Sequence, residues 1–237
     1  MTISEVTNNW SSGTSATLSF TPGPTTTVGD LLVLLVGSGR SPLDAGSAPT
    51  ISDLAGWVPI HDVGFYQGVT YYRRRRRTRA WARYYQSGDS SWSVTCGGMG
   101  SGESWGGVIW TLRGLSGPLV AATTSQRPDS GDPWNADDPG AAVQMVNILA
   151  RCVTHSTVPS TWTPDASWDC GRKQETSPSL SLYVAARLGP AAAGTVSLTA
   201  GGTSSDVCTV STFSENAVRR PRTSVGILVV GAGVSSS

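Results

Sequence analysis

The sequence predicts an all-β fold, an antiparallel two-sheet β-sandwich of the jelly-roll or lectin-like kind. Several short segments alternate apolar and polar residues, as half-buried strands do; residues 92–96 and 196–200 are examples. Residues 31–36 form an unbroken apolar run, which is typical of a strand buried on both faces. The chain also has 28 glycines and 14 prolines, which many tight turns require, and it shows no long amphipathic helical pattern.

Seven strands are expected before residue 115, and turn-forming Gly, Ser, Thr, Pro or Asp residues bound each of them. Alternating polarity predicts the first and the sixth, and β-branched, aromatic or continuous apolar residues favour the others. In order, they cover residues 15–20, 30–38, 56–61, 68–75, 79–86, 91–96 and 105–113. If 68–75 and 79–86 form a hairpin, the arginines between them lie at its tip.

Six further strands are expected on the same grounds, at residues 118–124, 143–153, 180–188, 194–200, 206–213 and 224–231. The total exceeds that of a seven-stranded immunoglobulin-type sandwich. One large sandwich over residues 1–237 is the simplest arrangement. The alternative is two echoing halves, 1–126 and 141–237, joined by an acidic Pro/Gly linker at 127–140.

The two halves contain one segment that matches position by position. Residues 92–98 are Trp-Ser-Val-Thr-Cys-Gly-Gly, and residues 196–202 are Val-Ser-Leu-Thr-Ala-Gly-Gly. Each follows an aromatic-rich expected strand and precedes a Ser/Gly loop. An internal repeat is one interpretation, and two unrelated strands that both end in Gly-Gly are the other.

Charged residues make up only 14% of the chain, and their distribution is uneven. Arg73 to Arg77, Arg79 and Arg83 are seven of the 17 basic residues, so the other ten face 16 acidic residues and leave a charge of −6 elsewhere. The first residues lack the basic and apolar regions of a secretory signal. We therefore expect synthesis in a reducing cytoplasm, and no membrane segment because the longest apolar run is too short.

The arginine run is flanked by aromatic residues and contains no acid. Adjacent arginines repel one another, so an anionic surface beside them would relieve that cost. The candidates are an acidic patch on a neighbouring subunit, nucleic acid or an anionic glycan; a solvated basic loop is the alternative. Subunit contact is preferred and nucleic acid is disfavoured. The predicted contact residues are Arg73, Arg74, Arg75, Arg76, Arg77 and Arg79.

Nine tryptophans are many for 237 residues. Trp57, Trp92 and Trp110 lie in strand patterns, which favours the core. The candidate glycan-contact residues are Trp134, Trp162 and Trp168. They lie in polar segments expected to be loops, where an indole ring could stack on a sugar.

No constellation predicts catalysis, a metal or a cofactor. Residues 102–106 match the Gly-x-Ser-x-Gly nucleophile motif around Ser104, but a strand and not a helix is expected after it. The histidines, His61 and His155, are expected in loops or at the surface. Asp129, Asp132, Asp137 and Asp138 lack the spacing of a calcium loop. The cysteines Cys96, Cys152, Cys170 and Cys208 contain no Cys-x-x-Cys pair, which favours buried thiols over zinc; a disulfide is the alternative.

A series of short motifs between residues 14 and 114 resembles a group of β-sandwich virion proteins of tailed bacteriophages. These motifs are Val28–Gly37, Gly56–Ile60, Tyr71–Arg73, Ser91–Val94 and Trp110–Gly114. The five-arginine run and Val58, where the group has threonine, depart from the pattern. The resemblance implies a minor tail or capsid-associated protein without catalytic residues.

Together these expectations describe a non-enzymatic structural component of a tailed phage virion, either a minor tail protein or a capsid decoration protein. Its partners would be other virion proteins, with the chain present as a homo-oligomer or in symmetric copies. The alternative is a carbohydrate-binding adhesin module that recognises the host cell envelope.

Overall fold

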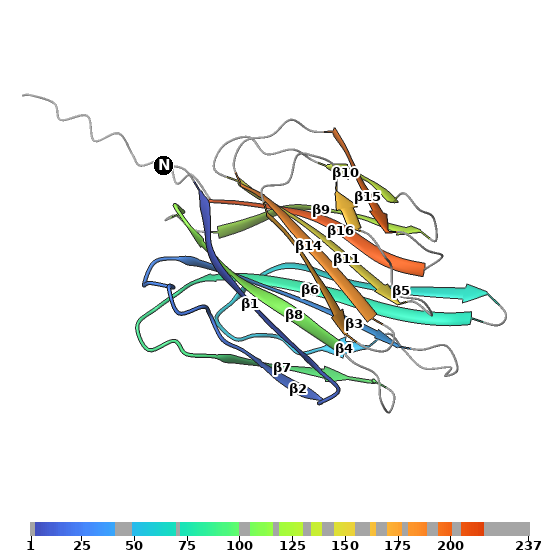
Figure 1. Cartoon of the computed structure of the whole chain (residues 1–237), viewed down its shortest axis with the longest axis horizontal. Helices are drawn as coiled ribbons and strands as arrows, with labels where there is room; N and C mark the ends of the chain where they lie inside the picture. Colours follow the sequence, from blue (N-terminus) through green and yellow to red (C-terminus); the bar gives the residue numbers. More distant parts are fainter. Residues whose placement is uncertain are drawn as a thin grey trace, which may run out of the picture.

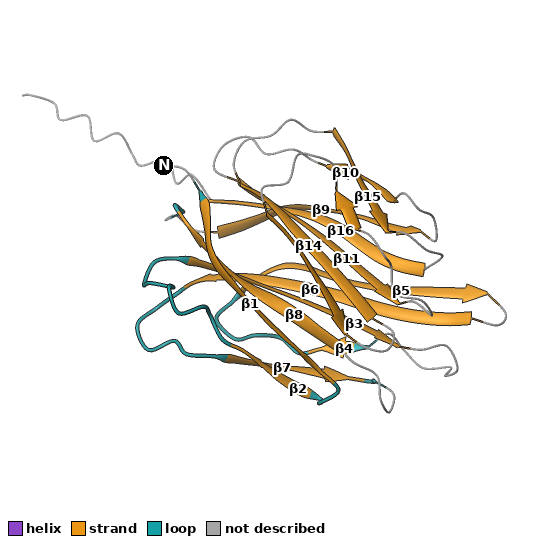
Figure 2. Ribbon diagram, in the orientation of Figure 1, coloured by secondary structure: helices purple, strands orange, loops and turns teal. Residues whose placement is uncertain are grey.

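The computed structural model describes residues 3–40, 49–69, 72–99, 105–115, 119–129, 134–138, 145–154, 162–164, 170–176, 180–188, 194–200 and 205–215. Side chains are described within 3–38, 49–63, 77–99 and 105–115. Every regular element in these ranges is a β-strand (Figure 2), and they include no helix long and apolar enough to cross a membrane.

The first eight strands form two antiparallel sheets, so the prediction of an all-β two-sheet sandwich is confirmed. The five-stranded sheet has, in spatial order, β1 (Ser4–Gly13), β8 (Trp105–Arg113), β3 (Leu31–Arg40), β6 (Tyr72–Tyr84) and β5 (Val58–Val69). The three-stranded sheet has the order β2 (Thr17–Phe20), β7 (Trp92–Gly97) and β4 (Thr50–Ile51).

Strand β3, the central strand of the five-stranded sheet, presents apolar side chains to both faces of that sheet. Its residues alternate between two apolar clusters, with Leu31, Val33 and Leu35 in one and Leu32, Leu34 and Val36 in the other. All six are fully buried, as the apolar run at 31–36 predicted. Burying one such side chain contributes roughly 1.5–3 kcal/mol, so this strand is a large part of the core.

The two clusters lie on opposite faces of the five-stranded sheet. The face toward β2, β7 and β4 packs Trp81, Trp105 and Ile109 against Phe20 and Val94. The opposite face is equally apolar and is covered by strands from the second half of the chain; its buried members include Ala80, Ala82, Val108, Trp110 and Leu112.

The second eight strands form another five-stranded and another three-stranded sheet. The larger has the order β13 (Cys170–Thr176), β14 (Leu180–Leu188), β11 (Met145–Thr154), β16 (Ser205–Glu215) and β9 (Leu119–Asp129). The smaller has the order β10 (Trp134–Asp138), β15 (Gly194–Ala200) and β12 (Trp162–Pro164).

The strand order of the first half is repeated in the second. When β9 to β16 are counted from one to eight, the sheets become 1-8-3-6-5 and 2-7-4, the same orders as for β1 to β8. Strands β7 and β15, which carry the matching segments at 92–98 and 196–202, are the seventh strand of each set and the central strand of each smaller sheet.

The two five-stranded sheets contact each other reciprocally. β1 contacts β13 and β5 contacts β9; β8 contacts β14 and β6 contacts β16; β3 contacts β11 in the middle. Counted from one in each half, first meets fifth, eighth meets sixth and third meets third. This is the pairing of an isologous interface about a two-fold axis. Figure 1 shows the four resulting layers, with the smaller sheets outside.

Several sequence predictions differ from the structure. Residues 68–75 and 79–86 were predicted to be two strands, but they belong mainly to one strand, β6. The predicted linker at 127–140 includes the end of β9 and all of β10. Strands β1, β4, β10, β12 and β13 were not predicted. The strand predicted at 224–231 lies outside the described residues.

Candidate functional site

The arginine run lies within β6, between two hydrogen-bonded neighbours. Arg73 to Arg77 are opposite Gly68 to Gly64 on β5, and Arg75 and Arg76 are also opposite Arg40 and Gly39 on β3. The expectation that the arginines occupy a hairpin tip is wrong, because the run lies inside β6 and the β5–β6 pairing continues past it to Val69 and Tyr72. The run extends a strand because arginine, unlike glycine or proline, does not interrupt one.

Strand alternation divides the arginines between the two faces of the sheet. Positions 73, 75, 77 and 79 fall on one face, and positions 74 and 76 fall on the other. The odd-numbered positions share their face with Trp81, which packs toward β2, β7 and β4. The residues opposite them on β5 are Gly68, Tyr66, Gly64 and Asp62. This face therefore carries a row of arginines that begins beside one carboxylate.

That carboxylate, Asp62, binds Arg77 through both of its oxygens. Arg77 Nε and Nη2 donate to Asp62 Oδ1 and Oδ2 at 2.6 and 2.7 Å. This fork-to-fork geometry is the strongest form of the pair. The hydrogen bonds that Arg77 donates to Asp62 are the main reason that the pKa of Arg77 is raised above its usual value.

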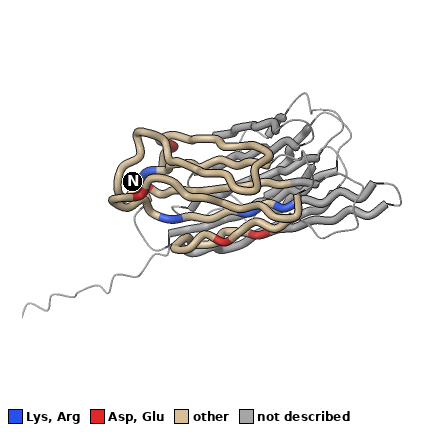
Figure 3. Tube along the Cα trace, turned by 90° about the horizontal axis from the view of Figure 1, so that it is seen from below, with Lys and Arg blue, Asp and Glu red and all other residues tan. Residues whose placement is uncertain are grey.

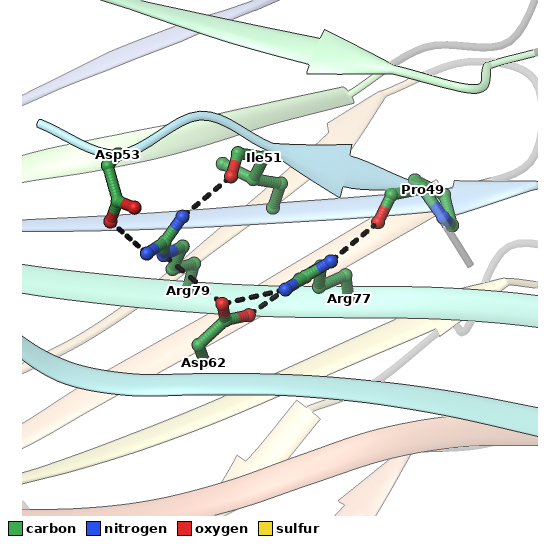
Figure 4. A network of polar contacts seen from close by, with 6 residues as sticks. All are labelled: Pro49, Ile51, Asp53, Asp62, Arg77 and Arg79. Carbon is green, nitrogen blue, oxygen red and sulfur yellow. Dashed lines mark hydrogen bonds and ion pairs between the residues drawn. The ribbon is translucent and has the colours of Figure 1, made fainter. Parts of the chain in front are cut away.

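Arg79 is held more deeply and ties two segments together (Figure 4). Its guanidinium donates to the backbone oxygen of Ile51 at 2.7 Å, pairs with Asp53 and lies 3.4 Å from Asp62 Oδ2. It also lies 5.1 Å from the ring centroid of Trp81. Because Arg77 also reaches the Pro49 oxygen at 3.4 Å, the two arginines fasten residues 49–53 to β5 and β6.

Every arginine whose side chain is described forms an ion pair. Besides Arg77 and Arg79, Arg83 pairs with Asp89 and Arg113 pairs with Asp30. Figure 3 marks these charged positions along the described trace. In the strand ladder, Asp62 is the last acid beside β6; from Gly64 to Val69 and from Gly39 to Arg40, no acidic residue faces an arginine.

The predicted glycan-contact residues are placed differently from expectation. Trp134 and Trp162 were predicted to be in loops, but each begins a short strand, β10 and β12. They are opposite Leu198 and Ala200 of β15, so the register places both tryptophans beside the same strand. Trp168 lies outside the described residues.

The tryptophans assigned to the core behave as predicted. Trp57 and Trp110 are buried, and Trp92 is half-buried with its ring centroid 5.0 Å from that of Trp57. Arg83 lies over both Trp57 and Trp92, at 5.9 and 5.4 Å from their centroids. The side chains of the Arg83–Asp89 pair are 16% and 15% exposed, so the pair is largely shielded from water.

His61 corrects a further prediction. It was expected at the surface or in a loop, but it lies inside β5 and is buried. Burial lowers the pKa of His61 to about 4, although the neighbouring Asp62 acts in the opposite direction. A neutral histidine fits this site because a charged imidazole would be poorly solvated there.

For the cysteines, the Gly-x-Ser-x-Gly motif and the second histidine, only some residues fall within the described part of the chain. Cys96 is a buried thiol, as the preferred interpretation expected. The strand predicted after the Gly-x-Ser-x-Gly motif is present as β8, whereas Ser104 and His155 lie outside the described residues. Within the part whose side chains are described, no group of three or more His, Cys, Asp or Glu residues could hold a metal ion.

Sequence reasoning missed the partners that organise this site. Asp53 and Asp62 lie 26 and 17 residues before Arg79, and their separation follows no motif spacing. A β-bulge between Pro59 and His61 places Asp62 opposite Arg79. A proline in the expected strand at 56–61, with an isolated acid directly after that strand, is the only sequence signal for this contact.

Comparison of the chain with protein-family models, with curated proteins and with solved structures finds no match.

Proposed function

We propose that this chain is a non-enzymatic structural component of a tailed phage virion that acts through contacts with other virion proteins. In this proposal it is made in the bacterial cytoplasm and is then built into the particle as a minor tail protein or as a capsid decoration or minor capsid protein. Its partners are capsid or tail subunits.

The observation that carries the proposal is the placement of the arginine run. Figure 1 shows that the β5–β6 hairpin extends past the end of β3. The register agrees, since β3 ends at Arg40 opposite Arg75 while β6 continues to Tyr72. Positions 73 and 74 thus lie where the sheet has narrowed to two strands, and positions 75 and 76 lie opposite the last two residues of β3. All four positions lie beyond the carboxylates that pair with Arg77 and Arg79.

A projecting basic hairpin suits a protein whose work is to contact an acidic neighbour. Two strands alone are marginally stable in water, so a projection of this kind gains stability when another surface packs on it. The resemblance of residues 14–114 to phage virion proteins supports the same interpretation, and it concerns the half of the chain that holds the hairpin.

Mass spectrometry of purified phage particles tests this function. We expect peptides of this chain in the particles at a fixed ratio to the major capsid protein. A tail component would be present in multiples of three or six, whereas a decoration protein would be present in many copies that follow capsid symmetry. Absence of the chain from purified particles would contradict both assignments.

A host-recognition role is the second candidate, and one observation favours it. The register brings Trp134 and Trp162 beside one strand, β15, at positions two residues apart. Tryptophan side chains on one face of a sheet suit stacking on successive sugars, which is why these two register positions favour a glycan contact. A glycan array tests the idea: binding that is lost in the Trp134→Ala, Trp162→Ala double variant supports it, and no binding by the unaltered chain contradicts it.

A further inference from the structure

We infer that the outer edge of β5, over residues 63–69, pairs with an added β-strand from an acidic segment of a neighbouring virion protein. The inference deepens the proposed function and rests on it, because it names the kind of contact that holds the chain in the particle. Its elements are the edge position of β5, the composition of that edge and the charge of the next strand inward.

β5 is the last strand of its five-stranded sheet. Its described hydrogen-bonded neighbour is β6, and its other side pairs with none of the described strands. The backbone N–H and C=O groups on that side form a template on which another strand can add. At 12 residues, β5 is longer than a typical strand of about five or six residues, so the template is long.

Proteins usually protect such an edge with charges, proline or a bulge. β5 has these devices only at its beginning, where Pro59, the bulge before His61 and the charge of Asp62 occur together. Residues 63–69 are Val-Gly-Phe-Tyr-Gln-Gly-Val, without a charge or a proline. The edge is therefore protected as far as Asp62 and open to pairing after it.

The second half of the chain contains a matched comparison. Strand β13 has the same position in its sheet as β5 and also pairs with the next strand as a hairpin. Its seven residues include Arg172, Lys173 and Glu175, so charges protect this edge. Of two edges with equivalent positions, only β5 lacks protection, and it is the one that lies beside the arginine run.

Charge identifies the occupant. A strand added to β5 would lie about 9.5 Å from β6, which is two strand spacings. Gly68 is opposite Arg73, so at this position no β5 side chain separates the arginine from the added strand. Carboxylates at every second residue of that strand would match the arginines on one face. A second copy of β5 would instead bring two arginine runs together and would be repelled.

The test uses the full chain and three probes: a peptide of about eight residues that alternates Glu and Val, the same peptide with Lys in place of Glu, and oligo-deoxythymidine. Fluorescence anisotropy measures binding, and amide hydrogen exchange locates it. We expect the Glu peptide alone to bind and to protect residues 63–69, while residues 170–176 of β13 exchange as before.

Two proline variants, Phe65→Pro and Tyr66→Pro, separate strand addition from simple charge attraction. In an antiparallel edge strand, adjacent residues direct their N–H groups alternately toward the neighbouring strand and away from it. One variant therefore breaks the ladder with β6 and lowers the melting temperature, whereas the other leaves the ladder intact. The variant that keeps the wild-type melting temperature should bind the Glu peptide at least about tenfold more weakly.

Three results would overturn the inference: no binding of the Glu peptide, equal binding in both proline variants and the wild type, or binding of oligo-deoxythymidine that survives both prolines. The last result would identify a polyanion site that does not use strand pairing. Each failure is distinguishable from failure of the virion role, because detection of the chain in purified particles does not depend on this peptide.

Discussion

At the level of single residues, the buried carboxylate of Asp30 is stabilised in its charged form by hydrogen bonds. Asp30 is 3% exposed and accepts hydrogen bonds from the Thr27 backbone and hydroxyl and from Arg113. Burial alone would raise the pKa of Asp30, but these hydrogen bonds outweigh it and lower the pKa below its usual value. The site fixes the turn at Gly29, whose φ of 92° requires glycine, to the start of β3.

Asp30→Asn should therefore destabilise the protein more than Asp53→Asn. The first change removes the charge from a buried, four-times hydrogen-bonded carboxylate and should cost roughly 1–3 kcal/mol in the free energy of unfolding. The side chain of Asp53 is 82% exposed, so its pair with Arg79 should contribute less than about 1 kcal/mol. Urea unfolding of both variants at neutral pH measures the difference; equal losses would contradict this account of Asp30.

His61 predicts a specific loss of stability in acid. Its pKa is about 4 in the folded protein, whereas an exposed histidine has an ordinary pKa of 6.5. Between these values the unfolded chain binds a proton that the folded chain does not, so stability falls as the pH is lowered through this window. From about pH 8 to about pH 4 the loss due to His61 is about 3 kcal/mol.

The matched variant is His61→Leu, which removes the titrating group and keeps an apolar side chain in the site. Carboxylates titrate in both proteins, so the difference between their pH profiles isolates the histidine. Unfolding free energies measured across this range should decline less steeply in the variant. Parallel profiles would mean that His61 is not buried as a neutral group.

At the level of the elements, close approach of strands sets the tolerance to substitution. Gly107 of β8 lies so near β3 that a Cβ placed there would be 2.3 Å from the Leu35 backbone oxygen. Backbone cannot yield as a flexible side chain can, so Gly107→Ala should cost about 2–3 kcal/mol. Gly13→Ala is the control, since its Cβ would meet only Leu18 at 3.4 Å and Ser15 at 3.9 Å.

Thermal unfolding of the two alanine variants provides the measurement. We expect a clearly lowered melting temperature for Gly107→Ala and a value near wild type for Gly13→Ala. A similar melting temperature for both would show that β8 and β3 are spaced more widely than this register requires.

The elements also show how far the sequence predicts the fold. Strands β8, β14 and β15 have the predicted bounds because Gly, Pro or Ser residues mark both ends. β1 was missed because Ser4–Gly13 is mostly polar; as an edge strand it has little need for alternation. The break predicted near Arg76 treated a charge run as a loop, although neighbouring strands with glycine and aspartate accommodate it. The ion-pair partners could not be predicted because they depend on the register.

For the whole molecule, the repeated strand order is the main result. Two eight-stranded units of the same topology meet through five-stranded sheets, and the face of the first unit at this interface is as apolar as a domain core. The common topology is what duplication of one unit would produce, and the five-arginine run belongs to the first unit alone. The pairing of halves is a tertiary property, and the short match of residues 92–98 with 196–202 was its only sequence signal.

Shared burial between the halves predicts that they unfold together. Six of the nine tryptophans lie in residues 1–115, so tryptophan fluorescence reports mainly on the first half, whereas far-ultraviolet circular dichroism reports on both. Thermal unfolding followed by the two signals should give one coincident transition. Two separated transitions would show that the sheet-to-sheet contact contributes little to stability.

The most direct test of the central claim compares particle incorporation of two variants of the arginine strand. Arg73–Arg76→Ser removes the part of the run that lies beyond Asp62 in the strand register, and Arg77→Ser removes the pair with Asp62. We expect Arg73–Arg76→Ser to keep the wild-type melting temperature but to be about tenfold depleted in purified particles. We expect Arg77→Ser to have a lowered melting temperature as the isolated protein. Full incorporation of the Arg73–Arg76→Ser variant would contradict a role for the arginine strand in assembly.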